Sequence, residues 1–292
     1  MQLLVVANFE KPQVEGALAE LMPWLEARCV VAGVLIDIDT LLIPQVPLDY
    51  ILVLGGDGTL LSTARALGDR PVPLVGINFG RLGFLAAFSV DQFKKQFEKL
   101  AAGKLPVSRR LQLEASVVAK TTSCKLTSYP DVVAKRRFVA TALNDAVVTA
   151  GPPFRMIELE LGEDGETFVE FFGDGVVVST PSGSTAYNVS AGGPIISPKV
   201  DALCVTPICP HSLSFRPVVV SARSTLLIGF GRVNEGTTLF CDGQASTTLT
   251  ADDQIVVRRS AHDVLLVENP TARQWKSLAE KLHWAIPPSY SK

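Results

Sequence analysis

The chain has 292 residues, of which 47% are hydrophobic and 19% are charged, and its formal net charge is −2. This composition is typical of a soluble globular protein with a sizeable core, built as one large domain or two ordinary ones. The charge argues against a general nucleic-acid binder, which needs a basic excess to neutralise phosphates. A small anionic ligand needs only a few cations and N–H groups and stays possible.

Cysteine usage and hydropathy predict a cytoplasmic protein. The five cysteines are scattered without zinc-ligand spacing, which favours free thiols in a reducing compartment; they are Cys29, Cys124, Cys204, Cys209 and Cys241. The N-terminus lacks the basic region of a signal peptide, and no apolar run reaches the roughly 18 residues of a membrane span. We therefore expect neither a nucleic-acid partner nor a membrane.

The first part of the chain, residues 1–108, alternates short apolar runs with helical patterns. Strands are predicted at residues 3–7, 50–54 and 73–77, because each is a buried-type apolar run. Between and after these strands, three stretches have apolar residues at helical spacing. They contain Val14, Leu18, Leu21 and Leu25, then Leu60, Leu61, Ala64 and Leu67, and then Phe93, Phe97 and Leu100. Gly68 is expected to end the second helix, and a Ser89/Gln92 capping box is expected to begin the third. Strands separated by helices predict a Rossmann-like parallel α/β layer.

Residues 109–267 are rich in β-type runs and turn residues and predict an antiparallel β-domain. Examples of the predicted strands are residues 140–149, 156–161, 167–172, 176–180, 218–220, 224–230 and 255–257. Asp164-Gly165 is typical of a two-residue hairpin turn. Residues 121–137 are polar and irregular, so we predict a mobile loop there. The α/β layer and the β-domain would meet where ligand clefts are common.

Residues 268–292 are predicted to form a last helix that returns to the N-terminal domain. Asn269-Pro270 offers an N-cap followed by a proline at the first helical position. Trp275, Leu278 and Leu282 would line its apolar side. The predicted fold class is thus α/β plus all-β.

The segment Gly55-Gly56-Asp57-Gly58-Thr59 lies between a predicted buried strand and a predicted helix. Glycines let the backbone bend tightly and approach a ligand, and a helix start directs N–H groups toward an anion such as phosphate. Asp57 would repel phosphates unless it binds a cation or takes up a proton, and both are useful in phosphoryl transfer. An ordinary turn with a solvated aspartate is the alternative. The G-x-x-x-x-G-K-[ST] and G-x-G-x-x-G phosphate loops do not match here.

This glycine segment resembles the signature of the NAD kinases, which is shared with diacylglycerol-type lipid kinases and, more distantly, with phosphofructokinases. Further segments resemble NAD kinases in particular and occur in the family's order. They are Gly76-Ile-Asn-Phe-Gly-Arg-Leu-Gly-Phe84, Ala142-Leu-Asn-Asp145, Asp174-Gly175 with Ser179-Thr-Pro-Ser-Gly-Ser-Thr-Ala-Tyr187, Pro210-His-Ser-Leu-Ser-Phe-Arg-Pro217 and Asp242-Gly-Gln244. The resemblance therefore runs from about residue 50 to residue 245.

The resemblance implies transfer of a phosphate from ATP to the 2′-hydroxyl of the adenosine ribose of NAD. Asp57 occupies the position of the family's proposed general base, a role that typically contributes about 10²–10⁴ in rate. Gly55, Gly56, Gly58 and Thr59 would bind the ATP phosphates. Mg²⁺ would be a cofactor carried with ATP, held mainly by phosphates and water rather than by a dedicated protein metal site.

The resemblance also implies an NAD site. Phe84 would stack on the adenine, Asn144 would hydrogen-bond it, and Asp145 would contact the ribose. The remaining implied NAD contacts, partly across a subunit boundary, are Asp57, Gly58, Arg155, Asp174, Thr185, Ala186, Tyr187, Asn188, Val189, Ser190 and Gln244. Each has a structural alternative: a core phenylalanine for Phe84, a strand end at residues 144–145, a surface charge for Arg155. His211, Cys204 and Cys209 are better interpreted as structural residues.

The sequence departs from the family pattern at two places, and two other functions compete with that of an NAD kinase. Phe172 stands where bacterial relatives often have a basic residue, which removes a possible phosphate contact, and residues 121–137 match no family segment. A lipid kinase would share the glycine segment but would lack the motifs at 174–175 and 179–187. A non-catalytic pyridine-nucleotide sensor would usually lack the aspartate that Asp57 supplies. The resemblance favours a homodimer or homotetramer.

Overall fold

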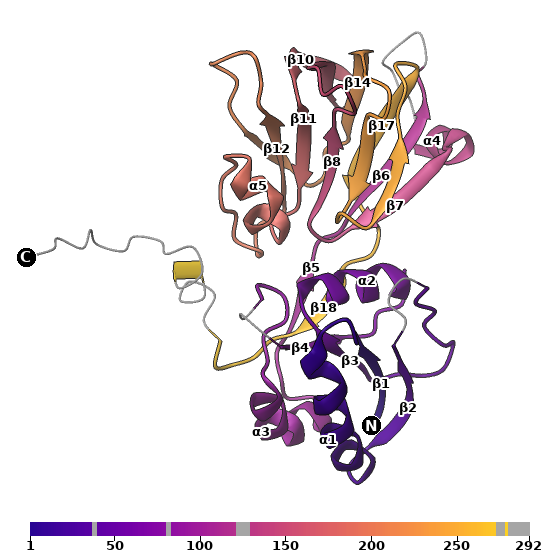
Figure 1. Cartoon of the computed structure of the whole chain (residues 1–292), viewed down its shortest axis with the longest axis vertical. Helices are drawn as coiled ribbons and strands as arrows, with labels where there is room; N and C mark the ends of the chain where they lie inside the picture. The colour runs from indigo at the N-terminus through magenta and orange to yellow at the C-terminus, as the bar shows by residue number, and fades with distance from the viewer. Residues whose placement is uncertain (37–39, 80–82, 121–128, 273–277, 280–292) are drawn as a thin grey trace, which may run out of the picture. The chain divides into compact units, whose positions relative to one another are not determined.

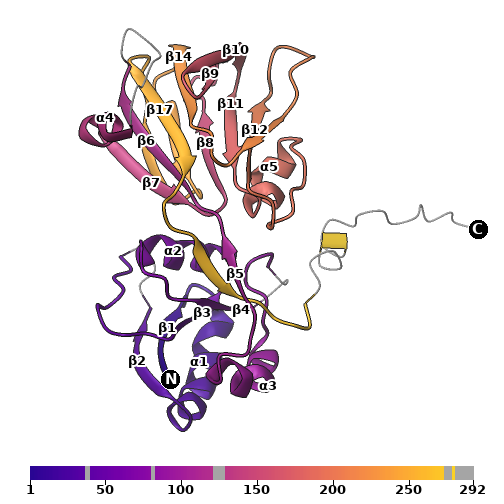
Figure 2. The ribbon, with the colours of Figure 1, turned by 180° about the vertical axis from the view of Figure 1, so that it is seen from behind.

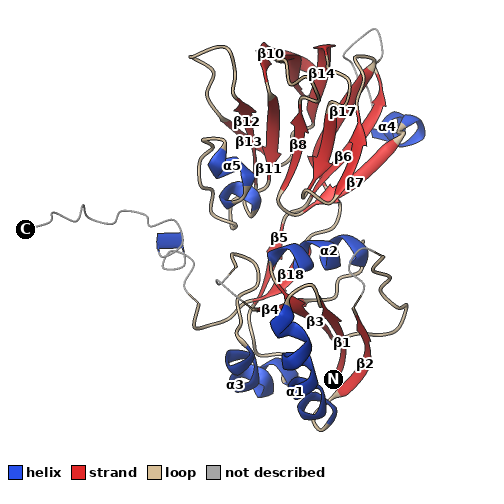
Figure 3. Ribbon diagram, viewed as in Figure 1, coloured by secondary structure: helices blue, strands red, loops and turns tan. Residues whose placement is uncertain are grey.

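The computed structural model describes residues 1–36, 40–79, 83–120, 129–272 and 278–279, without the side chains of residues 129–131. The chain divides into two compact units, Met1–Arg109 with Val264–Lys292, and Arg110–Asp263. Figure 3 shows that helices and strands alternate in the first unit, whereas strands dominate the second. This division of structure agrees with the predicted fold class.

The first unit contains a six-stranded sheet with the strand order β2-β1-β3-β4-β18-β5 (Figure 1). The pairs β1/β2, β1/β3, β3/β4 and β4/β18 are parallel, as the alternating pattern predicts. The bounds are β1 (Gln2–Ala7), β2 (Val30–Leu35), β3 (Tyr50–Gly55), β4 (Leu74–Asn78), β5 (Val107–Arg110) and β18 (Val264–Val267), with helices α1 (Pro12–Glu26), α2 (Asp57–Leu67) and α3 (Val90–Ala101).

The core of this unit follows the two periodicities of the sequence. Alternate residues of β1 pack with the apolar stripes of α1 and α3, so both helices cover the same face of the sheet. The four predicted core residues of α1 are all buried. The predicted capping box is present: Gln92 N–H donates to Ser89 Oγ (3.2 Å), and Ser89 N–H donates to Gln92 Oε1 (3.0 Å). Gly68 ends α2 with φ 63°, a conformation that favours glycine.

Strand β18 lies in a different sheet from the one that the sequence suggests. Its four residues stand before the predicted boundary at residue 267, yet Leu266 pairs in register with Leu74 of the parallel sheet. An isolated four-residue apolar run carries no signal of its partner, so only the tertiary fold decides its sheet. The helix predicted beyond it lies largely outside the described residues, although Asn269 does accept a hydrogen bond from Thr271 N–H (3.0 Å).

The second unit is a sandwich of two six-stranded sheets (Figure 2). One sheet has the order β10-β9-β14-β17-β6-β7 and the other β13-β12-β11-β8-β15-β16, and their neighbouring strands pair antiparallel. Inward residues of both sheets form one apolar core. The bounds of the first sheet are β6 (Leu113–Ala119), β7 (Phe138–Ala142), β9 (Ile157–Glu163), β10 (Glu166–Gly173), β14 (Leu226–Arg232) and β17 (Asp253–Arg259).

The bounds of the second sheet are β8 (Asp145–Thr149), β11 (Gly175–Ser179), β12 (Ala202–Ile208), β13 (Val218–Ser221), β15 (Thr238–Cys241) and β16 (Ala245–Thr248). The predicted hairpin turn is confirmed, because Asp164 and Gly165 join β9 to β10 with φ values of 51° and 91°. Short helical turns η1 (Gly183–Thr185) and α5 (Tyr187–Ser190) follow β11.

The prediction of a mobile loop over residues 121–137 is wrong for its second half. Residues Tyr129–Lys135 form helix α4, which lies beside β6 and β7 in both views (Figures 1 and 2). Val132 is buried against Val118, Leu227 and Val256 on the outer face of the sheet. Val132 thus gives this short helix an apolar anchor on the sheet. Residues 121–128 lie outside the description.

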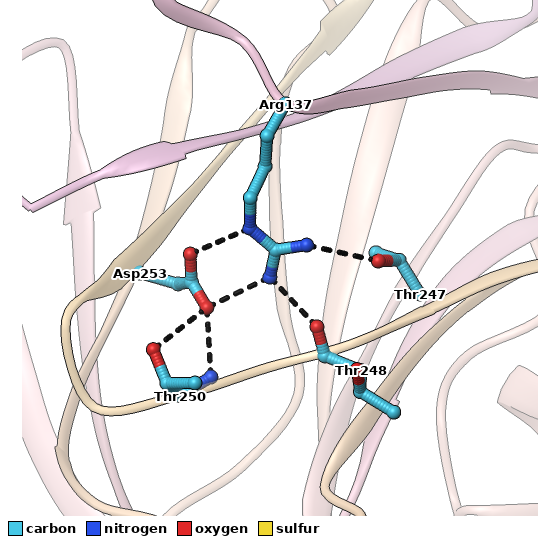
Figure 4. Close-up of polar contacts among 5 residues, drawn as sticks. All are labelled: Arg137, Thr247, Thr248, Thr250 and Asp253. Carbon is cyan, nitrogen blue, oxygen red and sulfur yellow. Dashed lines mark hydrogen bonds and ion pairs between the residues drawn. The ribbon is translucent and has the colours of Figure 1, made fainter.

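Arg137, the last residue of the predicted loop, joins the two sheets of the sandwich at one edge (Figure 4). Its Nε and Nη2 donate to Oδ1 and Oδ2 of Asp253 on β17, each at 2.8 Å. Its Nη1 donates to Thr247 Oγ1 (3.0 Å), and Nη2 donates to the Thr248 carbonyl (2.7 Å) on β16. Burial alone would raise the pKa of Asp253, but hydrogen bonds from Arg137 and Thr250 outweigh it and hold that pKa below its ordinary value.

Candidate functional site

The glycine segment occupies the turn from β3 into α2. The helix begins at Asp57, inside the segment that the sequence predicts to precede it. A Cβ on Gly55 would lie 2.3 Å from Thr59 Oγ1, so this glycine makes room for Thr59, which is itself buried. The space around the Cβ position of Gly58 is open. Of the predicted phosphate-binding residues, Gly58 thus has room for a ligand, whereas Gly55 and Thr59 pack against each other.

Asp57 is held in one orientation by the segment that follows β4. Its Oδ2 accepts a hydrogen bond from Phe84 N–H (2.8 Å), and its Oδ1 accepts from Leu85 N–H (3.2 Å) and Ala86 N–H (3.0 Å). A Cβ on Gly83 would lie 1.9 Å from Oδ1, so only glycine permits this approach. Because Oδ2 accepts one of these three bonds, it keeps a lone pair that can take a proton.

This contact joins two motifs that the sequence singled out separately. The glycine segment contributes the carboxylate, and the end of the Gly76–Phe84 motif contributes the first of the N–H donors. The structure therefore brings Phe84 to Asp57 through its main chain, while its side chain is half-buried. Residues 80–82 of that motif lie outside the description.

A pocket of about 300 Å³ lies in the second unit, on the outer face of the sheet that contains β8. Alternate residues of β8 and β15 face it, because their neighbours Ala146, Val148 and Leu239 point into the sandwich core. The pocket is lined by Asn144, Asp145, Val147, Thr149, Ala186, Tyr187, Phe240, Asp242 and Gly243. Four predicted NAD-binding residues are therefore brought together: Asn144, Asp145, Ala186 and Tyr187.

The pocket depends on a break between β7 and β8, where the sequence analysis predicts one strand over residues 140–149. That prediction is wrong, because β7 and β8 belong to different sheets. Asp242, in the turn between β15 and β16, accepts hydrogen bonds from the consecutive N–H groups of Leu143 (2.8 Å), Asn144 (2.7 Å) and Asp145 (3.2 Å). These N–H groups bond a side chain instead of a neighbouring strand, so the chain can change sheets here.

Asp145 is an unusual carboxyl group at the base of this pocket. Its exposed fraction is 6%. Burial and the negative charge of Asp242 raise its pKa to about 7, although a hydrogen bond from Tyr187 N–H acts in the opposite direction. Three N–H donors stabilise the charge of Asp242, and this charge favours the protonated form of the neighbouring Asp145.

The segment after β11 closes one side of the pocket. A Cβ on Gly183 would lie 2.0 Å from the Asn144 carbonyl oxygen, so the turn packs directly on the β7–β8 break. Thr180 N–H donates to the same carbonyl (2.8 Å). Asn188 is fully buried: its Nδ2 donates to the Ser184 and Pro194 carbonyls at 3.1 and 3.0 Å, and its Oδ1 accepts from Thr206. Asn188 therefore organises the segment with its own amide.

The other predicted NAD-binding residues do not line the pocket. Arg155 is exposed, and its carbonyl accepts a hydrogen bond from Asn234. Asp174 follows β10, and its carboxylate raises the pKa of the neighbouring Cys209, first through a hydrogen bond with the thiol and then through its charge. Gln244 lies in the turn that contains Asp242 and Gly243. Thr185, Val189 and Ser190 lie on η1 and α5 around the lining residues.

Sequence reasoning missed Asp242 and Phe240 as site residues. Asp242 lies in the Asp-Gly-Gln segment from which only Gln244 was assigned a role. The backbone of Asp242 has a positive φ of 53°. A sequence does not display this angle, but an Asp-Gly pair favours it and could have pointed to the turn. Among the described residues, no helix is long and apolar enough to cross a membrane, and His, Cys, Asp and Glu form no group of three or more that could hold a metal ion.

Comparison with protein-family models finds two matches. Residues 39–105 match the ATP-NAD kinase N-terminal domain, and residues 143–269 match the ATP-NAD kinase C-terminal domain. The first match contains Asp57, and the second contains the pocket. The two matches together define a kinase that acts on a nucleotide.

Curated relatives and solved structures agree. An NAD kinase of Solibacter usitatus is 36% identical over 96% of both chains, and one of Geobacter sulfurreducens is 34% identical over 97% of this chain and 98% of its own length. Yeast NADH kinase complexed with NADH has a TM-score of 0.82 at 25% identity, covering 100% of this chain and 90% of its own. An Archaeoglobus fulgidus NAD kinase in complex with ATP has a TM-score of 0.70 at 27% identity, covering 97% and 99%. The chain belongs to the NAD kinase family, and its substrates are NAD and ATP.

Proposed function

We propose that this kinase phosphorylates the 2′-hydroxyl of the adenosine ribose of NAD and that Asp57 is the general base. Oδ2 of Asp57 takes the hydroxyl proton while the ribose oxygen attacks the γ-phosphorus of ATP. The bond between the γ-phosphorus and the β,γ-bridging oxygen breaks, and ADP leaves. The observation that supports this role is the orientation of the Asp57 carboxylate by three main-chain N–H groups. A pre-oriented carboxylate avoids the entropic cost of ordering the base.

The pocket of the second unit suits the adenosine half of NAD. Asn144 supplies an amide, Asp145 a carboxyl group, and Tyr187 and Phe240 supply aromatic rings that a base can contact. We propose that the Phe84 side chain stacks on the adenine of NAD. The other residues that the sequence implies keep their proposed roles in NAD binding: Gly58, Arg155, Asp174, Thr185, Ala186, Asn188, Val189, Ser190 and Gln244.

Mg²⁺ enters this proposal as part of the substrate, coordinated by the phosphates of ATP. We also propose a homodimer or homotetramer in the cytoplasm. Chelation of Mg²⁺ by EDTA is expected to abolish turnover. Light scattering on the protein as it elutes from a size-exclusion column gives the mass of the oligomer. A panel of donors (ATP, polyphosphate) and acceptors (NAD, NADH) then defines the substrate range of the purified enzyme.

The substitution Asp57→Asn tests the general base. An amide cannot take the proton, so turnover is expected to fall by about 10²–10⁴. Asn keeps an acceptor for Leu85 and Ala86 but sets its NH₂ group against the N–H of Phe84, so NAD binding must be measured by calorimetry alongside turnover. Asp69→Asn, an exposed carboxylate just after α2, is the matched control. Near-normal turnover by Asp57→Asn would refute the general-base role.

A further inference from the structure

The loop that connects β1 to α1 lies directly against the glycine segment. Strands β1 and β3 are parallel neighbours, with Ala7 in register with Leu54, so the loops that follow them leave the same edge of the sheet. Asn8 N–H donates to the Leu54 carbonyl (3.0 Å), and Asn8 Nδ2 donates to Thr59 Oγ1 (3.4 Å). These bonds hold the first loop in a fixed position beside the second.

Lys11, at the end of the first loop, extends its ammonium group over Gly56. A Cβ on Gly56 would lie 2.4 Å from Lys11 Nζ and 3.6 Å from its Cε. The backbone of Gly56 is extended, with φ −144° and ψ −168°, a conformation open to any residue. Glycine at this position therefore provides space for the ammonium group rather than an unusual backbone conformation.

The charge of Lys11 is not neutralised by any residue that the structure describes. Within the described part of the chain, no carboxylate forms an ion pair with its ammonium group. The nearest carboxylate along the glycine segment, Asp57, is engaged by the N–H groups of residues 84–86. Lys11 is half-buried, and its ammonium group lies beside Gly56, in a turn with open space around the Cβ position of Gly58. This arrangement suits an anionic ligand.

We propose that Lys11 binds the triphosphate of ATP and supplies a cation that neutralises its charge during transfer. This inference rests on the proposed function, in which ATP is the donor, and on the expectation from the sequence that the glycine segment binds the ATP phosphates. It adds a residue that lies outside the motif. Phosphoryl transfer depends mainly on positioning and charge neutralisation, and lysine acts on phosphates as a point charge. Because Gly56 has no side chain, the Lys11 ammonium group can then reach the phosphates.

The first test is Lys11→Met, with binding of a non-hydrolysable ATP analogue and of NAD each measured by calorimetry. Loss of one charge-assisted hydrogen bond predicts about ten- to a hundredfold weaker analogue binding. NAD affinity is expected to stay within twofold, and Lys11→Arg is expected to restore part of the loss. Lys104→Met, which removes an exposed charge after α3, is the matched control. Unchanged analogue binding, or equal weakening of both ligands, would overturn the proposal.

The second test is Gly56→Ala, alone and combined with Lys11→Met. The added Cβ must displace the Lys11 ammonium group, so the single variant is expected to weaken analogue binding about as much as Lys11→Met does. In the double variant the alanine is expected to add less than twofold, because the displaced group is already gone. Full additivity would show that Gly56 serves another purpose and would overturn the coupling.

These binding measurements separate this inference from the proposed function. If Lys11→Met weakens analogue binding but wild-type protein yields no NADP, the proposed function fails and the role of Lys11 stands. If wild-type protein forms NADP and Lys11→Met binds the analogue normally, the role of Lys11 fails alone.

Discussion

The raised pKa of Asp145 makes a quantitative prediction about stability. Its ordinary value is 3.8, and in the folded protein burial and the charge of Asp242 raise it to about 7. A difference of about three pK units corresponds to about 4 kcal/mol between the folded and unfolded states. The folded state holds this proton more tightly, so the stabilising contribution is complete below pH 3.8 and is lost as pH rises through about 7.

The perturbation is Asp145→Asn, which keeps the size of the side chain and removes its titration. The free energy of unfolding of wild type relative to the variant is expected to fall by about 2.5 kcal/mol between pH 5 and pH 8. Because both proteins share their other titrating groups, the difference between the two pH curves isolates Asp145. A difference that is flat over this range, or that rises with pH, would refute the assignment of the proton to Asp145.

The assay must report on the second unit alone. Trp24 lies in α1 of the first unit, and the sequence of the second unit contains no tryptophan. Urea unfolding followed by the β-sheet signal in circular dichroism reports mainly on the sandwich, whereas tryptophan fluorescence reports on the first unit. The fluorescence transition should therefore be the same in wild type and Asp145→Asn at every pH. A shift in both signals would show that the substitution acts on the whole chain.

Two further predictions concern the sandwich edge and the adenine. Arg137→Met is expected to lower the free energy of unfolding by about 2 kcal/mol, below the cost for a fully buried pair because 41% of the arginine side chain is exposed. Since the pKa of Asp253 is lowered, the contribution of the Arg137–Asp253 pair is present at neutral pH and lost as pH falls through the folded pKa. In urea unfolding at low pH, the difference between Arg137→Met and wild type should therefore shrink to the part that comes from the hydrogen bonds to Thr247 and Thr248. Phe84→Ala is expected to weaken NAD binding about ten- to a hundredfold, because stacking on a base is worth about 1–3 kcal/mol, and to leave binding of the ATP analogue nearly unchanged. Equal weakening of the two ligands in calorimetry would remove Phe84 from the adenine site.

Local patterns predicted the elements of this protein well. The stripe of four apolar residues in α1, the Ser89/Gln92 capping box and the Asp164-Gly165 turn depend on neighbours a few positions apart, and each is present in the structure. Such signals depend only on residues within one element, so they do not depend on how the rest of the chain packs. The motif resemblance likewise placed Asn144, Asp145 and Tyr187 on one pocket.

The features that the sequence did not predict depend on distant partners. The strand break at Leu143 and Asn144 is fixed by Asp242, almost a hundred positions later. The position of Arg137 depends on Asp253, which follows it by 116 positions. A side chain that replaces a strand partner leaves no periodic trace, so an apolar run that changes sheets resembles one continuous strand.

The glycine segment shows that the glycines of one motif can have different packing tasks. From sequence, all its glycines serve the approach of a phosphate. In the structure, Gly55 leaves space for Thr59 and Gly56 leaves space for Lys11, whereas Gly58 has open surroundings. These contacts fix the positions of the β1–α1 loop, the glycine segment and Asp57 relative to one another before a ligand binds. A Cβ at Gly55 or Gly56 would therefore disturb ATP binding through a protein neighbour, even if it never touched the nucleotide.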